Sequence, residues 1–437
     1  MAKPAPMTFA RALYSALAWA AQPLLRRKLR RRAVAEPGYA VAVPERFGHY
    51  TPADLGRDGQ GQWVWIHSVS LGETRAAAIL IKALRERLPQ MRLLLTHSTA
   101  TGREEGAKLL QKGDVQVWLP WDSLRATRSF IAQFRPAVGV LMETEIWPNL
   151  IAGCANAGIP LALANARLNE KSEAGALKMG PISRPTYAAL AAVWAQTEDD
   201  AKRLRNVGAQ VSAVLGNLKF DVQPDEVQLA RAANWRKALA KPVILFASSR
   251  EGEEALLLQQ LQQNPAALQA AQWLIVPRHP QRFDEVAQLI SDAGFALSRR
   301  SQWGDILPAD AHTIWLGDSL GEMPLYYGLA SVALMGGSFE PLGGQNLIES
   351  LACGTPVVLG PHTFNFSQAS EMAVQAGAAL RSADMAAGVE DALALVADAQ
   401  QLQTMQGKAR SFTQQHRGAA GATADAIVQL MKLNAPK

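Results

Sequence analysis

The sequence contains few of the residues that build covalent or metal-stabilised frameworks. Only two of its 437 residues are cysteines, Cys154 and Cys353, and both lie in apolar runs. The seven histidines are scattered, and neither an HxxxH nor a CxxC pair occurs. Two distant thiols do not make a disulfide framework, and isolated histidines do not make a zinc site. The sequence therefore predicts a protein of a reducing compartment that binds no metal.

An uninterrupted membrane span is also lacking. The apolar residues 7–25 approach the length of a spanning helix, but Arg11 and Pro23 weaken the stretch. A basic run, RRKLRRR, follows at residues 26–32, whereas a signal peptide carries its charge before its apolar region. We therefore predict that residues 1–35 form an amphipathic anchor with a basic collar, lying on anionic lipid and keeping the following domain cytoplasmic. An arm that binds nucleic acid, or that packs on the domain, is the alternative.

From residue 63 onward, short apolar runs alternate with segments of helical length. Continuous apolar strands separated by helices indicate a parallel sheet that is covered on both faces. A polar segment, residues 221–242, interrupts the pattern before a second series begins. Length and pattern together predict an α/β protein of two doubly wound domains. The expected strands are 63–70, 92–99, 115–121, 137–143, 160–166, 191–197 and 211–217 in the first series, and 242–249, 273–280, 313–318, 331–338 and 356–361 in the second.

Ligands of such sheets bind beyond the carboxyl ends of the strands, and the second series carries a glycine-rich block there. Residues 335–358 read MGGSFEPLGGQNLIESLACGTPVV, and we expect a helix to begin at about Gln345. Glycines let a backbone approach a phosphate, and Asn346 and Glu349 would share one helical face suited to ribose hydroxyls. A turn that only permits tight packing is the alternative. The block is neither a P-loop nor a GxGxxG motif.

Two further blocks of the second series end strands with polar residues. In IVPRHPQRF, Arg278 is a candidate phosphate clamp, with a surface arginine in a turn as the alternative. In GDSLGEMPLYYGLA, a glycine-rich turn and Glu322 precede a helix and offer groups for a base or a sugar. A helix cap formed by Asp318 or Ser319 is the alternative there.

Three charged residues of the first series stand out. In WIHSVSLGETRAA, Glu73 follows the first strand and opens a helix, where it is either a catalytic base or an acid that complements the helix dipole. We expect the dipole to keep this carboxylate ionised. Glu143 ends the strand of METEIWPNL, with a helix-start acid as the alternative. Lys219, in GNLKFD, lies at the expected hinge and is either a partner of developing negative charge or a solvated lysine.

Taken in order, these blocks resemble the 3-deoxy-D-manno-octulosonic acid (Kdo) transferases. The resemblance runs from about residue 36 to about residue 420 through HSVSLGE, ETEIWPN, NARLNEKS, GNLKFD, VPRHPQRF, GDSLGEMPLYY and GGSFEPLGGQNLIESLACGTPVV. It implies the GT-B fold, in which two Rossmann-like domains face a central cleft. Residues 36–222 would then bind the acceptor and residues 223–437 the CMP-sugar donor, with the C-terminal helix packing back on the first domain.

The resemblance also implies an activity and a set of site residues. The activity is inverting, metal-independent transfer of Kdo from CMP-Kdo to a glucosamine hydroxyl of the lipid A precursor (lipid IVA), at the cytoplasmic side of the inner membrane. No cofactor and no nucleic acid is implied. Glu73 would be the general base, and Glu143 and Lys219 would stabilise the transition state. The residues implied to contact CMP are Pro277, Arg278, Gly321, Glu322, Met323, Asn346, Leu347, Ile348 and Glu349.

Two alternatives to this function stay open at the level of sequence. One is another GT-B enzyme that uses a UDP-sugar, such as a hexosamine transferase or an epimerase. The other is a membrane-attached nucleotide-binding protein without transferase activity.

Overall fold

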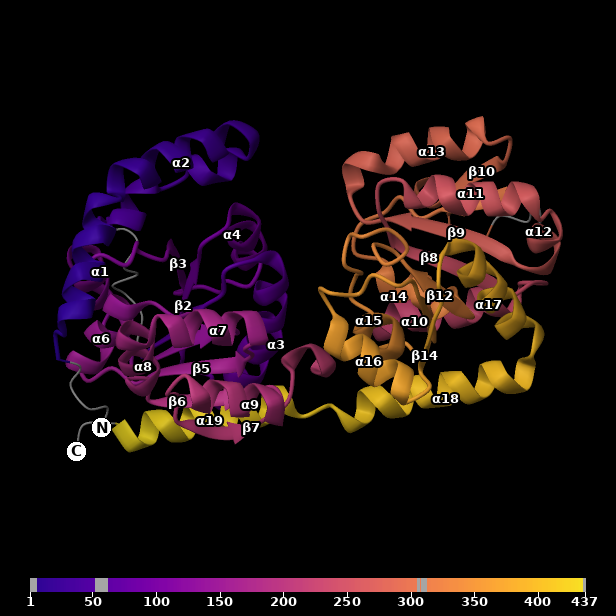
Figure 1. The fold of residues 1–437 in the computed structure, drawn as a ribbon. Coiled ribbons are helices and arrows are strands. Elements are labelled where there is room, and N and C mark those ends of the chain that lie inside the picture. The colour runs from indigo at the N-terminus through magenta and orange to yellow at the C-terminus, as the bar shows by residue number, and fades with distance from the viewer. Residues whose placement is uncertain (1–5, 52–61, 305–306, 308–312, 435–437) are drawn as a thin grey trace. The chain divides into compact units, whose positions relative to one another are not determined.

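The computed structural model describes residues 6–51, 62–304, 307 and 313–434 in two units (Figure 1). The first unit comprises Met1–Asp221 and Arg417–Lys437, and the second comprises Val222–His416. The predicted domain boundary, between residues 222 and 223, lies one residue from the boundary between the units. Residues 1–5 of the predicted anchor, and 435–437 of the predicted second domain, lie outside the described residues.

The first unit is built on a seven-stranded parallel sheet. Its strand order is β3-β2-β1-β4-β5-β6-β7. All the strands are parallel, and β1–β3 extend the sheet to one side whereas β4–β7 extend it to the other, so the switch point lies between β1 and β4. The strands are β1 (Trp63–His67), β2 (Arg92–His97), β3 (Val115–Trp118), β4 (Val138–Met142), β5 (Leu161–Ala166), β6 (Ala192–Ala195) and β7 (Val211–Val214). The helices are α1 (Phe9–Ala20), α2 (Gln22–Ala35), α3 (Leu71–Arg87), α4 (Ala100–Ala107), α5 (Leu124–Phe134), α6 (Pro148–Asn156), α7 (Glu170–Lys178), α8 (Gly180–Ala188), α9 (Glu198–Asn206) and α19 (Ala419–Asn434), with the 3-10 turns η1 (Pro37–Ala40), η2 (Val43–Phe47) and η4 (Leu218–Asp221).

Helices cover both faces of this sheet, which explains why its strands are apolar throughout. Phe130 of α5 and Leu150 of α6 pack on one face, and Leu80 of α3 packs on the other. The C-terminal helix α19 joins α3 on that second face through Ala424 and Ile427 (Figure 1). The last helix of the chain therefore completes the core of the first unit.

The second unit repeats the architecture with another seven-stranded parallel sheet, in the order β10-β11-β9-β8-β12-β13-β14. The strands are β8 (Val243–Ser249), β9 (Gln272–Pro277), β10 (Ala296–Arg299), β11 (Thr313–Leu316), β12 (Val332–Met335), β13 (Val357–Leu359) and β14 (Ala379–Arg381). The helices are α10 (Glu226–Lys237), α11 (Glu253–Gln263), α12 (Ala266–Ala270), α13 (Phe283–Asp292), α14 (Met323–Leu329), α15 (Ile348–Ala352), α16 (Ser367–Gln375), α17 (Met385–Ala397) and α18 (Ala399–Gln415), with η5 (Pro280–Arg282) and η6 (Arg300–Gln302).

All the predicted strands are present, but two strands of the second sheet were not predicted. These two, β10 and β14, are its edge strands. The sequence of β10 is ALSR, and its side chains are exposed or only partly buried, whereas β14 has three residues. An edge strand packs against a single neighbour and so does not require a continuous apolar run. The edge strands β3 and β7 of the first sheet nevertheless carry largely apolar runs and were predicted, whereas β10 and β14 are too polar or too short to give that signal.

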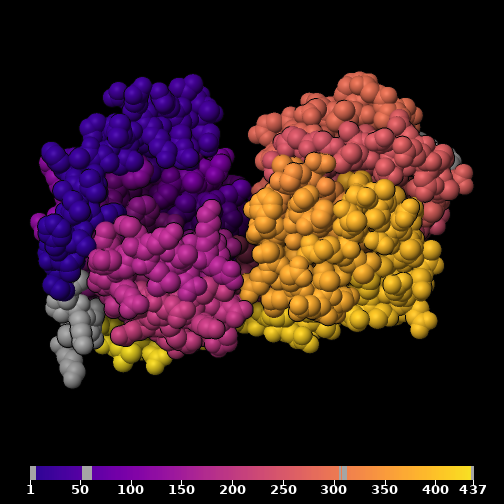
Figure 2. Space-filling view, in the orientation of Figure 1, coloured from indigo at the N-terminus to yellow at the C-terminus, as the bar shows by residue number. Residues whose placement is uncertain are grey.

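The N-terminal apolar stretch folds as two helices, α1 and α2, and the basic run lies within α2. Among the described residues, no helix combines the length and the apolar character that crossing a membrane requires. The inner face of α1 docks on the first unit, since the Tyr14 hydroxyl donates to Asp122 Oδ2 at 2.9 Å and the Ser15 hydroxyl donates to Asn149 Oδ1 at 2.9 Å. Figure 2 shows both helices, in indigo, on the surface of this unit.

Candidate active site

The loop between β1 and α3 fixes the position of Glu73. Ser70 caps α3, and its hydroxyl accepts the backbone N–H of Glu73. In return, Glu73 Oε2 accepts the N–H of Val69 at 2.9 Å, and Oε1 lies 3.2 Å from the Ser70 hydroxyl. This reciprocal arrangement closely resembles a capping box. The interpretation of Glu73 as a residue of the helix start is therefore confirmed, and it accounts for the orientation of the side chain.

Burial gives Glu73 a second property that capping does not require. It raises the pKa of the carboxyl to about 7, and the nearby carboxylates of Glu143 and Glu145 add to this rise. The hydrogen bond from Val69 and the ring of His67 lower the pKa, but by less. Desolvation, which favours the neutral carboxyl, thus opposes the effect that we expected of the helix dipole, which favours the ionised one. A carboxyl that titrates near pH 7 suits general base catalysis.

Glu143 lies directly after β4 and is held between two cations. The Lys219 ammonium is 3.1 Å from its Oε1, and the Arg167 guanidinium Nε is 2.9 Å from its Oε2. Glu143 is almost completely buried and has a left-handed backbone, with φ of 57°. A non-glycine residue in this conformation costs about 1–3 kcal/mol, so the surrounding structure must hold it there. The structure thus brings the predicted pair, Glu143 and Lys219, together.

Glu145 has a different environment from Glu143. Its Oε2 accepts the indole N–H of Trp147 at 2.8 Å and lies 3.7 Å from Nε2 of the buried His67. No cation of an arginine or lysine is recorded beside it among the described residues, whereas Glu143 has two. Glu145 therefore contributes negative charge near Glu73 but lies outside the ion-pair cluster of Glu143, Lys219 and Arg167.

In the second unit, the predicted phosphate clamp is held by the glycine-rich loop. Pro277 ends β9, and the N–H of Arg278 donates to the carbonyl of Ser249 at 2.9 Å. The Arg278 guanidinium Nε donates to Gln345 Oε1 at 3.2 Å. Arg278 is thus positioned by neighbouring segments of this unit, which an arginine of a solvated turn would not be.

The glycine-rich loop differs from our expectation in two ways. Its helix, α15, begins at Ile348 rather than at about Gln345 and has only five residues. The predicted pairing nevertheless forms, because the Asn346 amide donates to Glu349 Oε1 at 3.1 Å and its Oδ1 accepts the N–H of Ile348. Leu347 and Ile348 are fully buried, so their side chains are core residues and only their backbone groups are available to a ligand.

The second difference is that N–H groups of this loop bind a carboxylate of the protein itself, that of Glu253, which the sequence analysis missed. Glu253, the first residue of α11, is completely buried and its carboxylate accepts the N–H groups of Gly337 at 2.6 Å and Phe339 at 3.0 Å. Gly336 also packs so tightly that a Cβ there would lie 2.2 Å from the carbonyl oxygen of Ser248. The packing interpretation therefore holds for the first glycine pair. The signal for Glu253 was the Gly–Glu pair after β8, which repeats the Gly72–Glu73 pattern after β1.

The third predicted block of the second unit is a turn that an ion pair between Arg300 and Glu322 stabilises. Glu322 precedes α14, and its Oε1 lies 2.7 Å from the guanidinium of Arg300, a residue that the sequence analysis did not single out. Gly321 has a φ of 80°, which favours glycine, and Met323 begins the helix. Neither Asp318 nor Ser319 caps α14, so that alternative is wrong: Asp318 instead binds Arg299 and Ser301.

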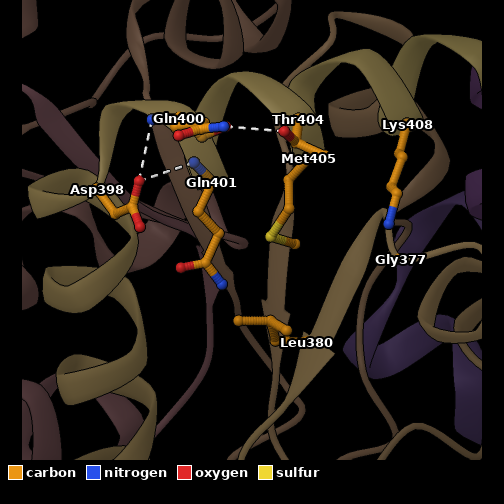
Figure 3. Close-up of a pocket in the computed structure, with 8 residues that line it drawn as sticks. All are labelled: Gly377, Leu380, Asp398, Gln400, Gln401, Thr404, Met405 and Lys408. Atoms are coloured by element: carbon orange, nitrogen blue, oxygen red, sulfur yellow. Dashed lines mark hydrogen bonds between the residues drawn. The ribbon is translucent and has the colours of Figure 1, made fainter.

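The predicted site residues of the second unit lie apart from a hollow in the surface of that unit. A hollow of about 470 Å³ lies between α18 and β14 (Figure 3). Gly377, which lines it, precedes β14, whereas the predicted site residues follow the carboxyl ends of their strands. None of the predicted residues lines this hollow. Within the described part of the chain, no group of three or more metal-ligating side chains is present.

Comparison with known proteins gives one family name, through a family model that matches the first unit and relatives that cover most of the chain. Residues 42–222 match the family described as "3-Deoxy-D-manno-octulosonic-acid transferase (kdotransferase)". A 3-deoxy-D-manno-octulosonic acid transferase of Bordetella pertussis is 47% identical over 401 residues, which covers 89% of this chain and 92% of that protein. The enzyme of the same name from Haemophilus influenzae is 30% identical over 430 residues, covering 97% and 99%.

A solved structure supports the fold alone. The UDP-GlcNAc 2-epimerase from Neisseria meningitidis, bound to UDP-GlcNAc, superposes with a TM-score of 0.55 at 17% identity, covering 85% of this chain and 100% of that one. The predicted GT-B class of two Rossmann-like domains is thereby confirmed. From the sequence relationship, the chain is a glycosyltransferase and belongs to the 3-deoxy-D-manno-octulosonic acid transferase family.

Proposed function

We propose that this protein transfers Kdo from CMP-Kdo to a glucosamine hydroxyl of a lipid A precursor, with inversion and without a metal ion. Beyond the family relationship, the observation that carries the proposal is the buried carboxyl of Glu73, whose pKa of about 7 is that of a usable general base. The same unit supplies the charged cluster of Glu143 and Lys219 beside it.

The proposed chemistry is a single displacement at the anomeric carbon of Kdo. Glu73 accepts the proton of the acceptor hydroxyl while that oxygen forms the new bond, and the bond to the CMP oxygen breaks with its electron pair. One base suffices because inversion needs one attack from the face opposite the leaving group. The Lys219 ammonium, held in place by Glu143, stabilises the negative charge that develops.

The donor is proposed to bind through the second unit. Arg278, which Gln345 orients, offers its guanidinium to the phosphate, and Pro277 shapes the turn beside it. Asn346 and Glu349 offer polar groups to the ribose, together with the backbone of Leu347 and Ile348. The turn formed by Gly321, Glu322 and Met323 is proposed to contact the rest of CMP.

Membrane attachment is proposed to occur through α1 and α2. Phe9, Leu13 and Leu17 recur every four residues, and between 52% and 86% of each side chain is exposed. The basic run 26–32 follows in α2 and complements anionic phospholipid. We place the protein at the cytoplasmic side of the inner membrane, lying in the interface, where its lipid acceptor is accessible.

The test is incubation of the purified protein with CMP-Kdo and a tetraacylated lipid A precursor, followed by mass measurement of the lipid. The expected product is the precursor plus Kdo, also when a chelator is present. Glu73→Gln should abolish transfer while CMP binding persists, and near-normal turnover of that variant would reject Glu73 as the base. Thermal stabilisation by UDP but not by CMP would favour a UDP-sugar enzyme instead.

A further inference from the structure

The carboxylate of Glu253 is completely buried, and among the described residues its recorded partners are backbone N–H groups rather than a cation. Its Oε2 accepts the N–H of Gly337 at 2.6 Å and that of Arg250 at 2.9 Å. Its Oε1 accepts the N–H of Phe339 at 3.0 Å and that of Glu340 at 3.4 Å. A completely buried carboxylate thus receives four backbone N–H groups from two separate segments.

Convergent backbone N–H groups in a glycine-rich loop are the usual chemistry of an anion site. Here, three of the donors come from the loop after β12, and the anion is a side chain of the protein itself. The backbone of Gly336 approaches the carbonyl of Ser248 too closely for any side chain. The loop is therefore clamped against the segment 248–253 by a covalently attached anion.

This clamp is connected to the group proposed to hold the donor phosphate. The carbonyl of Gly337, whose N–H binds Glu253, accepts the N–H of Gly344 at 2.6 Å. The next residue, Gln345, accepts a hydrogen bond from the Arg278 guanidinium. The sequence of contacts thus runs from Glu253 through two glycines to Gln345 and Arg278, entirely within the second unit.

We propose that Glu253 is a positioning residue of the donor site: an internal anion that fixes the glycine-rich loop, so that Gln345 and Arg278 meet the phosphate of the donor. The inference rests on the proposed donor role of Arg278. The Glu253 carboxylate accepts the N–H groups of Gly337, Phe339 and Glu340 in this loop.

The test is Glu253→Ala, which leaves a vacant anion site with four unpaired donors. We expect the Kd of CMP, measured by calorimetry, to rise by at least about tenfold, because buried donors without acceptors destabilise the bound arrangement of the loop. Added sodium formate should restore much of the affinity, whereas sodium chloride at equal ionic strength should not. The KM for the lipid acceptor should stay unchanged. Glu251→Ala is the matched control, because Glu251 is an exposed carboxylate two residues before Glu253, in the segment 248–253.

Three outcomes would overturn this inference: a lowered melting temperature with an unchanged Kd of CMP, a raised Kd that formate leaves unchanged, or an equal effect in Glu251→Ala. If Glu253→Ala does not fold, Glu253→Gln is the deciding variant. Its amide keeps the volume of the side chain but sets an NH₂ group against two of the four backbone N–H groups that the carboxylate accepts. The Kd of CMP must then rise in Glu253→Gln, and an unchanged Kd rejects the role. Failure of the wild-type protein to bind CMP overturns the proposed function and this inference with it.

Discussion

The carboxylate of Glu73 is held by its own segment, since Val69 and Ser70 both contact it. These contacts orient the group, and burial sets its proton affinity. The two effects act in opposite directions on the pKa, because a hydrogen bond to the carboxylate favours ionisation while desolvation disfavours it. Desolvation is the larger, so the site holds an oriented carboxyl that exchanges its proton near neutral pH.

The first prediction is the pH dependence of transfer. Because a general base must be ionised, and the pKa of Glu73 is about 7, kcat/KM should fall about tenfold per pH unit below pH 7 and level off above it. Steady-state rates across this range check the prediction. An acidic limb placed near the ordinary glutamate pKa of 4.5 would contradict it.

The second prediction concerns stability and has the opposite sign. A carboxyl whose pKa is raised in the folded state stabilises the fold below its unfolded pKa, and this contribution is lost as the pH rises through about 7. The loss reaches about 3 kcal/mol above that pH. Glu73→Gln has no charge to bury, so its free energy of unfolding should gain on the wild type between about pH 5 and pH 8. Urea unfolding of both proteins at pH 5 and pH 8 measures this difference. The same difference in free energy between variant and wild type at both pH values would disprove the prediction.

The third prediction separates the two cations of Glu143. Lys219 is largely buried, with 23% of its side chain exposed, whereas Arg167 is 51% exposed. Removing the more buried partner of a buried charge is the more costly change, so Lys219→Met should lower the free energy of unfolding by about 1–3 kcal/mol and also reduce kcat. Arg167→Gln is the control and should cost less stability. Equal losses in both variants would show that burial does not rank the two contacts.

At the scale of elements, α1 has two faces with different partners. Its inner face docks through Tyr14 on Asp122, whose carboxylate also accepts the N–H groups of Asn149 and Leu150. Its outer face carries exposed apolar side chains. A helix anchored in this way could make the proposed contact with lipid through its outer face without leaving the domain.

The fourth prediction uses the two faces of α1 against each other. Replacing Leu13 and Leu17 by aspartate should weaken binding to anionic vesicles by at least about tenfold, because two apolar side chains no longer enter the interface. The melting temperature should not change. Tyr14→Phe should behave in the opposite way, costing about 1 kcal/mol of stability without affecting vesicle binding. Cosedimentation and thermal unfolding measure the two effects, and unchanged cosedimentation of the aspartate variant would reject the lipid-facing surface.

At the scale of the molecule, the first unit is built from two separate parts of the chain, whereas the second unit is one continuous segment. The segment 417–437 comes last, but α19 belongs to the core of the first unit. Asp221 receives the N–H groups of Gly418 and Ala420 at 2.5 and 2.6 Å, which fixes the start of this segment. Arg87 of α3 pairs with Asp425 of α19 at 2.6 Å.

The fifth prediction follows from this arrangement. Deleting residues 417–437 should lower the unfolding temperature of the first unit, since Ala424 and Ile427 leave buried positions against α3 and expose its apolar face. Arg87→Ala is the control for the exposed ion pair with Asp425 and should leave the unfolding temperature nearly unchanged, because solvent screens exposed ion pairs. A deletion variant that unfolds like the wild type would show that α19 is dispensable.

Prediction from the sequence succeeded where the signal was local. Continuous apolar runs revealed the covered strands of both sheets. The contact between Glu143 and Lys219 was anticipated because one follows a strand and the other lies at the hinge, whereas the catalytic role of Glu73 stays a prediction. It failed at β10 and β14, which are too polar or too short to give that signal, and at the start of α15, where Asn346 and not a helical turn precedes Ile348. It also missed Glu253, although Gly252 and Glu253 repeat the pattern of Gly72 and Glu73.

The sequence by itself determined the family, the number of parallel sheets and the residues that follow their strands, because periodicity and motif order are properties of neighbouring residues. Only the tertiary structure decided that the pKa of Glu73 is raised, since this shift depends on burial and on the nearby Glu143. It also brought the carboxylate of Glu253 to the N–H groups of the glycine-rich loop. Both outcomes depend on groups far apart in the chain, and only folding brings their charges and donors within contact distance.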